Sequence, residues 1–185
     1  MRVKPQIIYL WAVTLAALLS YGIVTMILAK PFGNKENVSR VIENKTLPPV
    51  TFYDRAGKEL GLERFRGKAV LVNLWATWCT PCVAELPALG RVSKQLGGKL
   101  EVVAINLDRK ADPQQITAFL AKHEAAGLSL YLDRDREIPA AWSQLYQGLP
   151  TSFLLDPVGN IVETFNGPFE WDKPEILARL EAATK

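Results

Sequence analysis

Residues 69–82 read AVLVNLWATWCTPC and hold both cysteines of the chain. The almost wholly apolar run Ala69–Leu74 predicts a buried strand. The Cys-Thr-Pro-Cys segment that follows is continued by Val83-Ala84-Glu85-Leu86 and predicts the opening of a helix. Both cysteines of the 185-residue chain therefore stand at one junction between a strand and a helix.

The spacing of Cys79 and Cys82 predicts two thiols that can close into a disulfide. Three residues apart on a helix, their Cα atoms lie about 5 to 5.5 Å from each other, within the range that a disulfide accepts. Cys79 is expected at the helix N-terminus, where free N–H groups and the helix dipole stabilise a thiolate. We therefore interpret Cys79 as a nucleophile and Cys82, which is one turn further in and covered, as the resolving thiol.

Two other uses of a cysteine pair fit less well. A static structural disulfide normally joins distant segments, because closing a small loop removes little entropy from the unfolded chain. A zinc site needs four ligands, and the chain offers no further cysteine and a single histidine, His123, which is expected to be solvated. A zinc site within one chain is therefore almost excluded, whereas a metal shared between two chains stays open.

The N-terminal segment predicts a membrane anchor over residues 1–29. No charged residue occurs from Pro5 to Ala29. Residues 7–28 are almost wholly apolar and long enough to cross a hydrocarbon core of about 30 Å. We expect contact with the lipid bilayer through residues 7–29. The alternative is a cleaved signal peptide, but its apolar stretch would normally be about 7 to 15 residues and end in a small-x-small site.

The flanking charges and the cysteines bear on the side of the membrane. Arg2 and Lys4 before the span place the N-terminus in the cytoplasm by the positive-inside rule. Basic residues after the span, Lys30, Lys35 and Arg40, oppose that orientation. Because disulfides persist outside the cytoplasm, we expect a single-pass protein of the cytoplasmic membrane, with its folded part on the periplasmic or extracytoplasmic side.

Charge and composition argue against a nucleic-acid partner and divide the rest of the chain into a linker and one folded domain. The formal net charge of +3 is small, and basic residues beyond the N-terminal region are interleaved with acidic ones. This pattern is typical of a solvated surface, so no nucleic-acid partner is expected. Residues 30–46 are polar and mixed in charge, and are interpreted as a linker. The folded domain is expected over residues 47–185.

Within that domain, the pattern alternates strands and helices and begins with a hairpin. Strands are expected over residues 50–53, 58–62, 69–74, 99–107, 128–132, 151–155 and 161–165. Helices are expected over residues 79–96, 112–125 and 136–146, the last interrupted by Pro139, and from Asp172 onward, with a helical turn at 62–65. This order predicts an α/β three-layer domain whose central sheet mixes parallel and antiparallel strands.

Two motifs carry a family likeness. The run WCTPC at residues 78–82, together with GLPTSFLLD at residues 148–156, closely resembles the thioredoxin fold. Within that fold, the chain from about Leu47 to the C-terminus resembles the membrane-anchored TlpA/ResA/CcmG (DsbE) group of extracytoplasmic thiol-disulfide oxidoreductases. The likeness implies an enzyme whose redox centre is the Cys79–Cys82 dithiol or disulfide, with no other cofactor and no metal.

The likeness also assigns individual residues. Pro150 matches the cis-proline of the family, which packs beside the cysteine pair, and the backbone at Leu149 would pair with an extended substrate segment. Glu85 matches an acidic residue near the active site of the ResA-like branch and could accept or relay a proton; a surface glutamate is the alternative. Substrate contacts are expected from Trp78, Thr80, Pro81, Leu149, Pro150 and Thr151.

One position departs from thioredoxin. Cytoplasmic-type thioredoxins keep a buried aspartate six residues before the first cysteine, and this chain has Asn73 there. Asparagine cannot ionise, so the usual proton acceptor for the resolving thiol is missing. Glu85 is the expected substitute. Trp75 is expected in the core, and Trp78 on a docking face.

These observations predict a reductant of protein disulfides. The likeness implies apocytochrome c as a typical client, and a membrane or soluble thiol donor must restore the dithiol. A client in copper-site assembly or stress response, a disulfide-introducing oxidase, and a binding module for Cu(I) or client thiols are the alternatives. A methionine-based copper site is poorly supported, because Met1 and Met26 both lie outside the domain.

Overall fold

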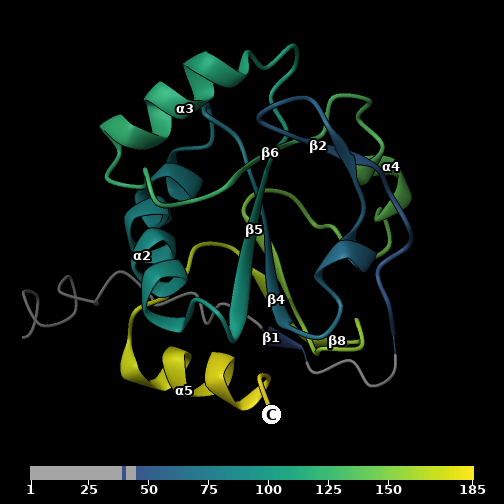
Figure 1. Cartoon of the computed structure of the whole chain (residues 1–185), viewed down its shortest axis with the longest axis vertical. Helices are drawn as coiled ribbons and strands as arrows, with labels where there is room; N and C mark the ends of the chain where they lie inside the picture. Colours follow the sequence, from purple (N-terminus) through teal and green to yellow (C-terminus); the bar gives the residue numbers. More distant parts are fainter. Residues whose placement is uncertain (1–38, 41–44) are drawn as a thin grey trace, which may run out of the picture. The chain divides into compact units, whose positions relative to one another are not determined.

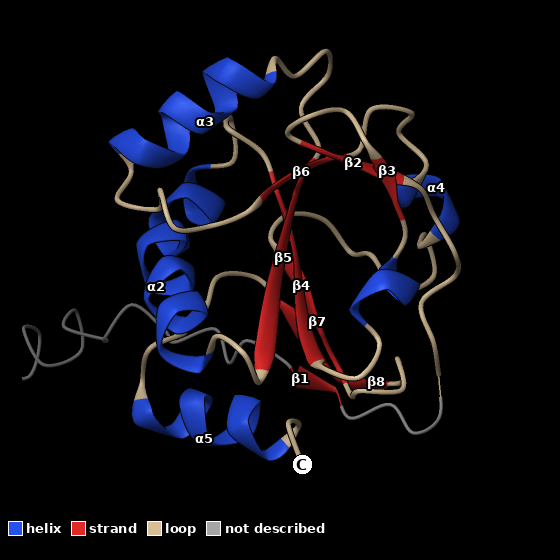
Figure 2. Cartoon of the chain, viewed as in Figure 1, coloured by secondary structure: helices blue, strands red, loops and turns tan. Residues whose placement is uncertain are grey.

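The computed structural model describes residues 39–40 and 45–185 of the chain. In these residues, the strands form one sheet in the order β1-β8-β7-β4-β5-β6-β2-β3 (Figures 1 and 2). The strands are β1 Ser39–Arg40, β2 Phe52–Asp54, β3 Glu59–Leu60, β4 Ala69–Trp75, β5 Leu100–Asn106, β6 Leu130–Leu132, β7 Thr151–Leu155 and β8 Ile161–Asn166. The helices are α2 Thr80–Leu96, α3 Pro113–Lys122, α4 Ile138–Ala141 and α5 Pro174–Ala182, with a 3₁₀ turn η1 at Leu62–Phe65.

The sheet mixes both strand directions, as the sequence predicts. Strand β4 runs parallel to β5 and antiparallel to β7. Strand β6 continues the parallel part, whereas β8 and the β2–β3 hairpin pair antiparallel. Because β4 lies between β5 and β7, its C-terminal end is held from both sides at the point where the cysteine segment begins.

Helices cover both faces of the sheet. All seven residues of β4 are buried. Ala69, Leu71 and Trp75 face a cluster built with α2, α3 and α5, whereas Val70, Val72 and Leu74 face a cluster that includes α4. Figure 2 shows α2, α3 and α5 on one side of the sheet and α4 on the other. This alternation is the mark of a strand buried on both faces, and it confirms the predicted three layers.

Two predicted elements differ from the structure. The helix expected over residues 136–146 is confined to α4, Ile138–Ala141. Arg136 has φ 59°, a left-handed conformation that cannot continue a helix. Pro139 lies in the first turn of α4 rather than interrupting it, because proline is well tolerated where no N–H is needed. The expected linker also contributes pairing, since β1 joins β8 and Thr46 forms a bridge with Asn160.

The predicted membrane anchor lies outside the described residues. Among residues 39–40 and 45–185, no helix combines the length and the apolar character needed to span a bilayer. The anchor over residues 1–29 stays a prediction from the sequence.

Candidate active site

The cysteine pair lies where β4 passes into α2. Cys79 is the N-cap of α2, with Pro81 in the first turn, and its sulfur accepts the backbone N–H of Cys82 at 3.3 Å. Cys79 and Cys82 form a disulfide with a Cα–Cα distance of 5.3 Å, which matches the separation predicted from helix geometry. Cys79 thus stands at the end of the helix where free N–H groups favour an anion.

Exposure differs sharply along this segment. The Trp78 side chain is 70% exposed, whereas Cys79 is 5% exposed and Cys82 is fully buried. Thr80 and Pro81 are exposed beside them. An incoming sulfur can therefore reach this site at Cys79, while Cys82 is covered, as expected for a resolving thiol. Trp75 is fully buried, which confirms its predicted place in the core.

The loop before Cys79 is held by Asp108, which follows β5. The Asp108 carboxylate accepts the backbone N–H of Thr77, at 3.1 Å to Oδ1 and 3.3 Å to Oδ2. Asn106 in turn donates from Nδ2 to Asp108 Oδ2 at 3.2 Å. The loop that carries Trp78 is thereby fixed by a side chain from the segment that follows the neighbouring parallel strand.

The second motif leads into β7, the strand paired with β4. The Leu149–Pro150 peptide bond is cis, as the family likeness implies. Pro150 directly precedes β7, and Thr151 is paired with Leu74 near the end of β4. Leu149 packs against the apolar cluster that contains Cys79 and Cys82. Thr151 is buried and its hydroxyl donates to the carbonyl of Gly148 at 2.6 Å, so it shapes this loop.

Glu85 is buried, only 3% exposed, one turn after Cys82. Its Oε1 accepts a hydrogen bond from Asn73 Nδ2 at 2.7 Å. Its Oε2 accepts the backbone N–H of Phe169 at 3.1 Å and the indole N–H of Trp171 at 3.1 Å. The alternative of an ordinary surface glutamate is therefore wrong.

The environment of Glu85 adjusts its proton affinity. Burial raises the pKa of its carboxyl group from 4.5 to about 7, although the hydrogen bonds from Phe169, Asn73 and Trp171 oppose the rise. A buried carboxyl group with a pKa near neutrality can both accept and return a proton at physiological pH. Such a group beside a resolving thiol is suited to proton transfer during thiol-disulfide exchange.

Three residues of this hydrogen-bond network could not be identified from the sequence. Ser152 accepts a hydrogen bond from Asn73 Nδ2 at 2.9 Å, and Phe169 and Trp171 bond Glu85 across more than 80 residues of chain. Asp108 is likewise absent from any motif. The one sequence cue to Asp108 is its position just after a parallel strand, at the sheet edge where functional sites commonly form.

The described residues offer no group of three or more histidine, cysteine or acidic side chains that could hold a metal ion. His123 is half-buried at the C-terminal end of α3, where its ring lies 4.3 Å from the ring of Phe119. It is therefore not fully solvated, and it belongs to the aromatic packing around α3.

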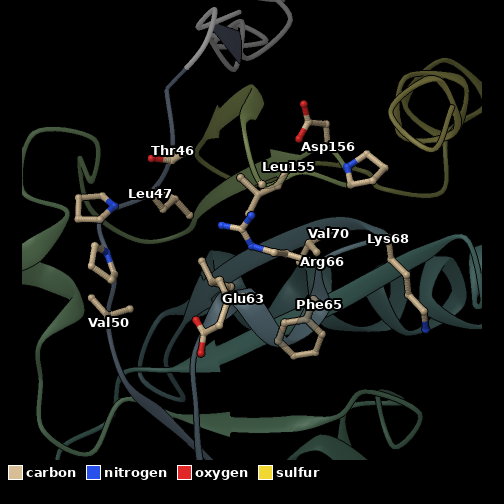
Figure 3. Close-up of a pocket in the computed structure, with 15 residues that line it drawn as sticks. Thr46, Leu47, Val50, Glu63, Phe65, Arg66, Lys68, Val70, Leu155 and Asp156 are labelled. Atoms are coloured by element: carbon tan, nitrogen blue, oxygen red, sulfur yellow. The ribbon is translucent and has the colours of Figure 1, made fainter.

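A separate cavity of about 250 Å³ lies at the opposite end of β4 and β7 from the cysteines. Figure 3 shows the Arg66 side chain among its lining residues, with Glu63, Leu47 and Leu155 around it. It contains neither cysteine nor Glu85, so it is not the redox site. Its lining consists of Thr46, Leu47, Pro48, Pro49, Val50, Leu62, Glu63, Phe65, Arg66, Lys68, Val70, Leu155, Asp156, Pro157 and Gly159.

Comparison with known proteins agrees with this geometry. Residues 42–180 match the Redoxin family. The chain belongs to the Redoxin family. Thiol-disulfide oxidoreductase ResA of Bacillus subtilis is 31% identical over 137 residues, which cover 74% of this chain and 72% of ResA. The thioredoxin-like protein YneN of Bacillus subtilis is 28% identical over 172 residues, covering 92% of this chain and 96% of YneN.

A solved structure of a related type is also similar to this Redoxin-family chain. A Chlorobium tepidum protein described as a candidate thiol:disulfide interchange protein DsbE superposes with a TM-score of 0.67 at 26% identity. The match covers 79% of this chain and the whole of that one. With the Cys79–Cys82 disulfide at the helix N-terminus, these matches identify a protein thiol-disulfide oxidoreductase of the ResA/DsbE type that uses a CxxC pair.

Proposed function

We propose that this Redoxin-family protein is anchored in the cytoplasmic membrane and reduces disulfides of client proteins on the extracytoplasmic side. The observation that carries the proposal is the Cys79–Cys82 pair at the N-terminus of α2. Cys82 is fully buried there, and the buried carboxyl group of Glu85 lies one turn further along. The cytoplasmic flank of Arg2 and Lys4 and the apolar run at 7–28 support the anchor.

The reaction proceeds by two exchanges. The Cys79 thiolate attacks one sulfur of a client disulfide, which forms a mixed disulfide and releases the second client sulfur as a thiolate. Cys82 then attacks Cys79, the Cys79–Cys82 bond forms, and the first client sulfur leaves. The client gains two electrons and the cysteine pair loses them. A membrane or soluble thiol donor then reduces the 79–82 bond.

Glu85 supplies proton transfer in the second exchange. A thiol is a poor nucleophile until it loses its proton, and Cys82 is out of reach of bulk water. Glu85 lies one helical turn from Cys82 on the same face of α2. With its pKa at about 7, it can take the proton of Cys82 and later release it.

The family likeness points to apocytochrome c as client. Its Cys-x-x-Cys-His segment must be in the dithiol form before haem is attached, and an extended segment could pair with the backbone at Leu149. The exposed Trp78, Thr80 and Pro81 would contact the segment beside the disulfide.

A trapping experiment tests the direction and the client together. The Cys82→Ser variant should accumulate a mixed disulfide on Cys79 with an oxidised Cys-x-x-Cys-His peptide, whereas Cys79→Ser should form none. The reduced wild-type chain should convert the same peptide to its dithiol form. A Cys79→Ser protein that still reduces the peptide, or a wild-type chain that only oxidises peptide dithiols, contradicts the proposal.

The location has its own test. A reporter enzyme that folds only outside the cytoplasm, fused after residue 185, should be active and should sediment with the membrane fraction. Replacing residues 1–29 with a cleavable signal peptide should release the active fusion into the soluble extracytoplasmic fraction. An inactive reporter on the full-length chain contradicts the proposed side.

A further inference from the structure

Asn73 carries an unusual vacancy in its hydrogen bonding. Its side chain is fully buried, and its Nδ2 group donates both to Glu85 Oε1 at 2.7 Å and to Ser152 Oγ at 2.9 Å. Among the described residues, no donor reaches its Oδ1. An unpartnered carbonyl oxygen is unfavourable in a protein interior. A second orientation of the amide would give Oδ1 the partner that it lacks here.

The partners of Glu85 differ in what they can offer. The backbone N–H of Phe169 and the indole N–H of Trp171 can only donate. They suit a carboxylate oxygen and cannot accept a proton from a carboxylic acid. The Asn73 amide can do both, because rotation about its last side-chain bond exchanges Nδ2 for Oδ1. Ser152 can do both as well, since a hydroxyl group donates and accepts.

We propose that Asn73 and Ser152 form a reversible hydrogen-bond partner for Glu85, in which the Asn73 amide turns by about half a rotation when Glu85 takes up a proton. In the ionised state, Nδ2 donates to Glu85 Oε1 and to Ser152 Oγ, as the structure shows. In the protonated state, Oδ1 accepts from Glu85 Oε1–H and from the Ser152 hydroxyl. Both contacts survive with their directions reversed, and one polar atom of the amide lacks a partner in either state.

This inference rests on the proposed role of Glu85 as proton acceptor, and it assigns the proton to one oxygen. Oε2 is held by two donors and stays unprotonated, so the proton resides on Oε1. In the resolving step, Cys82 S–H gives its proton to Glu85, the Cys82 sulfur bonds Cys79, and the client sulfur leaves as a thiolate that takes a proton from water. Asn73 and Ser152 are positioning residues, because they act through Glu85.

The groups around Glu85 indicate that the Asn73 amide responds to the protonation of Glu85 and not to that of another titratable group. The groups bonded to it come from β4 and from the segment between β8 and α5, and all of them are neutral. Cys79 and Cys82 precede it on its own helix. The nearby ion pair of Arg91 with Asp172 is substantially exposed, at 56% and 36% of the two side chains. Burial raises the pKa of Glu85 to about 7, so both states are accessible near neutral pH.

Magnetic resonance of the full-length disulfide form, purified in detergent, tests the rotation directly. Between pH 5 and 9, the Asn73 amide resonances should shift with the same midpoint as the Glu85 carboxyl carbon. Through-space contacts from the Asn73 NH₂ protons to the Ser152 β-protons should be present above that midpoint and lost below it. Contacts that persist unchanged on both sides overturn the proposal.

Glu85→Gln is the matched variant. Its amide can keep the two donors on its oxygen and must then donate from nitrogen toward Asn73, which imitates the protonated acid. The Asn73 resonances of this variant should show the low-pH pattern of the wild type at every pH. An Asn73 amide that keeps the high-pH pattern in Glu85→Gln also overturns the proposal, whatever the midpoint of the wild type.

Two further variants test whether Asn73 bonds Glu85 in both protonation states or, like Trp171, only as a donor to the carboxylate. Trp171→Phe removes a group that can only donate, so the midpoint of Glu85 should rise by about one pH unit. Asn73→Leu removes a partner of both protonation states and should move the midpoint by less than half as much. Equal upward shifts contradict the proposal, and the wild type and Glu85→Gln decide it if Asn73→Leu does not fold. Failure of the wild-type chain to reduce peptide disulfides would overturn the proposed function while leaving the rotation measurable.

Discussion

The indole N–H of Trp171 donates to Glu85 Oε2 at 3.1 Å across 86 residues of chain. The backbone N–H of Phe169 shares the same oxygen. These two donors attach the segment between β8 and α5 to the helix that carries the cysteines. Glu85, the proposed proton acceptor of Cys82, is thus held by the C-terminal part of the fold, so its ionisation is coupled to the stability of the domain.

Stability should therefore depend on pH through Glu85. The pKa of this group is raised from 4.5 to about 7 by burial, so the folded state binds the proton more tightly than the unfolded state. The stabilisation is fully present below about pH 4.5 and is lost as the pH rises through about 7. Relative to Glu85→Gln, the wild-type chain should lose roughly 3 kcal/mol of unfolding free energy across this window.

Denaturant unfolding of the full-length chain in detergent, followed by tryptophan fluorescence at several pH values, measures this difference. Glu101→Gln is the control, because Glu101 lies on β5 in a partly exposed pair with Lys68, and such a pair contributes little to the unfolding free energy. A Glu85→Gln protein whose unfolding free energy keeps the wild-type pH dependence contradicts the assigned burial cost.

Trp78 should act in client binding without a part in stability. Its side chain is 70% exposed beside Cys79, so truncation removes little buried area, and Trp78→Ala should change the unfolding free energy by less than about 0.5 kcal/mol. Exposed tryptophans at interfaces often contribute more than 1 kcal/mol to binding. Reduction of a protein client should therefore fall about tenfold through a higher KM, while reduction of a small linear disulfide such as bis(2-hydroxyethyl) disulfide stays unchanged.

Val158→Ala is the matched control for Trp78. Val158 is the other large exposed hydrophobic residue among those described, at 63%, and it lies in the turn between β7 and β8. Its truncation should leave both substrates unaffected. If Trp78→Ala lowers the reduction of the small disulfide as much as that of the client, the residue acts on the cysteines rather than on docking.

Local patterns predicted most of the fold and the reacting atoms. The apolar run of β4 and the spacing of the two cysteines each act over a few residues, so the sequence alone reveals them. The helix expected over residues 136–146 begins only at Ile138, because the left-handed backbone of Arg136 is not encoded by helix propensity.

The support of the site could not be predicted in the same way. Asn73 was visible as a departure from thioredoxin, but its contact with Ser152 depends on the antiparallel register of β4 with β7. Trp171 lies between β8 and α5 and reaches Glu85 across 86 residues of chain, and nothing near Trp171 in the sequence marks it. Burial of Glu85, which decides its proton affinity, is likewise a property of the assembled layers.

Variants of Asp108 should show whether client reduction depends on the hydrogen bond that positions the Cys79 loop or on the negative charge of Asp108. Asp108→Ala removes the acceptor of the Thr77 N–H and should lower the unfolding free energy by about 1.5 to 3 kcal/mol, since a hydrogen bond to a charged group contributes that much. Asp108→Asn keeps an acceptor oxygen and should retain most of that stability. Amide hydrogen exchange at Thr77 should accelerate strongly in the alanine variant and only slightly in the asparagine variant. Because Thr77 lies two residues before Cys79, client reduction should fall several-fold in Asp108→Ala and recover in Asp108→Asn. Equal losses in the two variants would assign the effect to the negative charge rather than to the hydrogen bond that positions the loop.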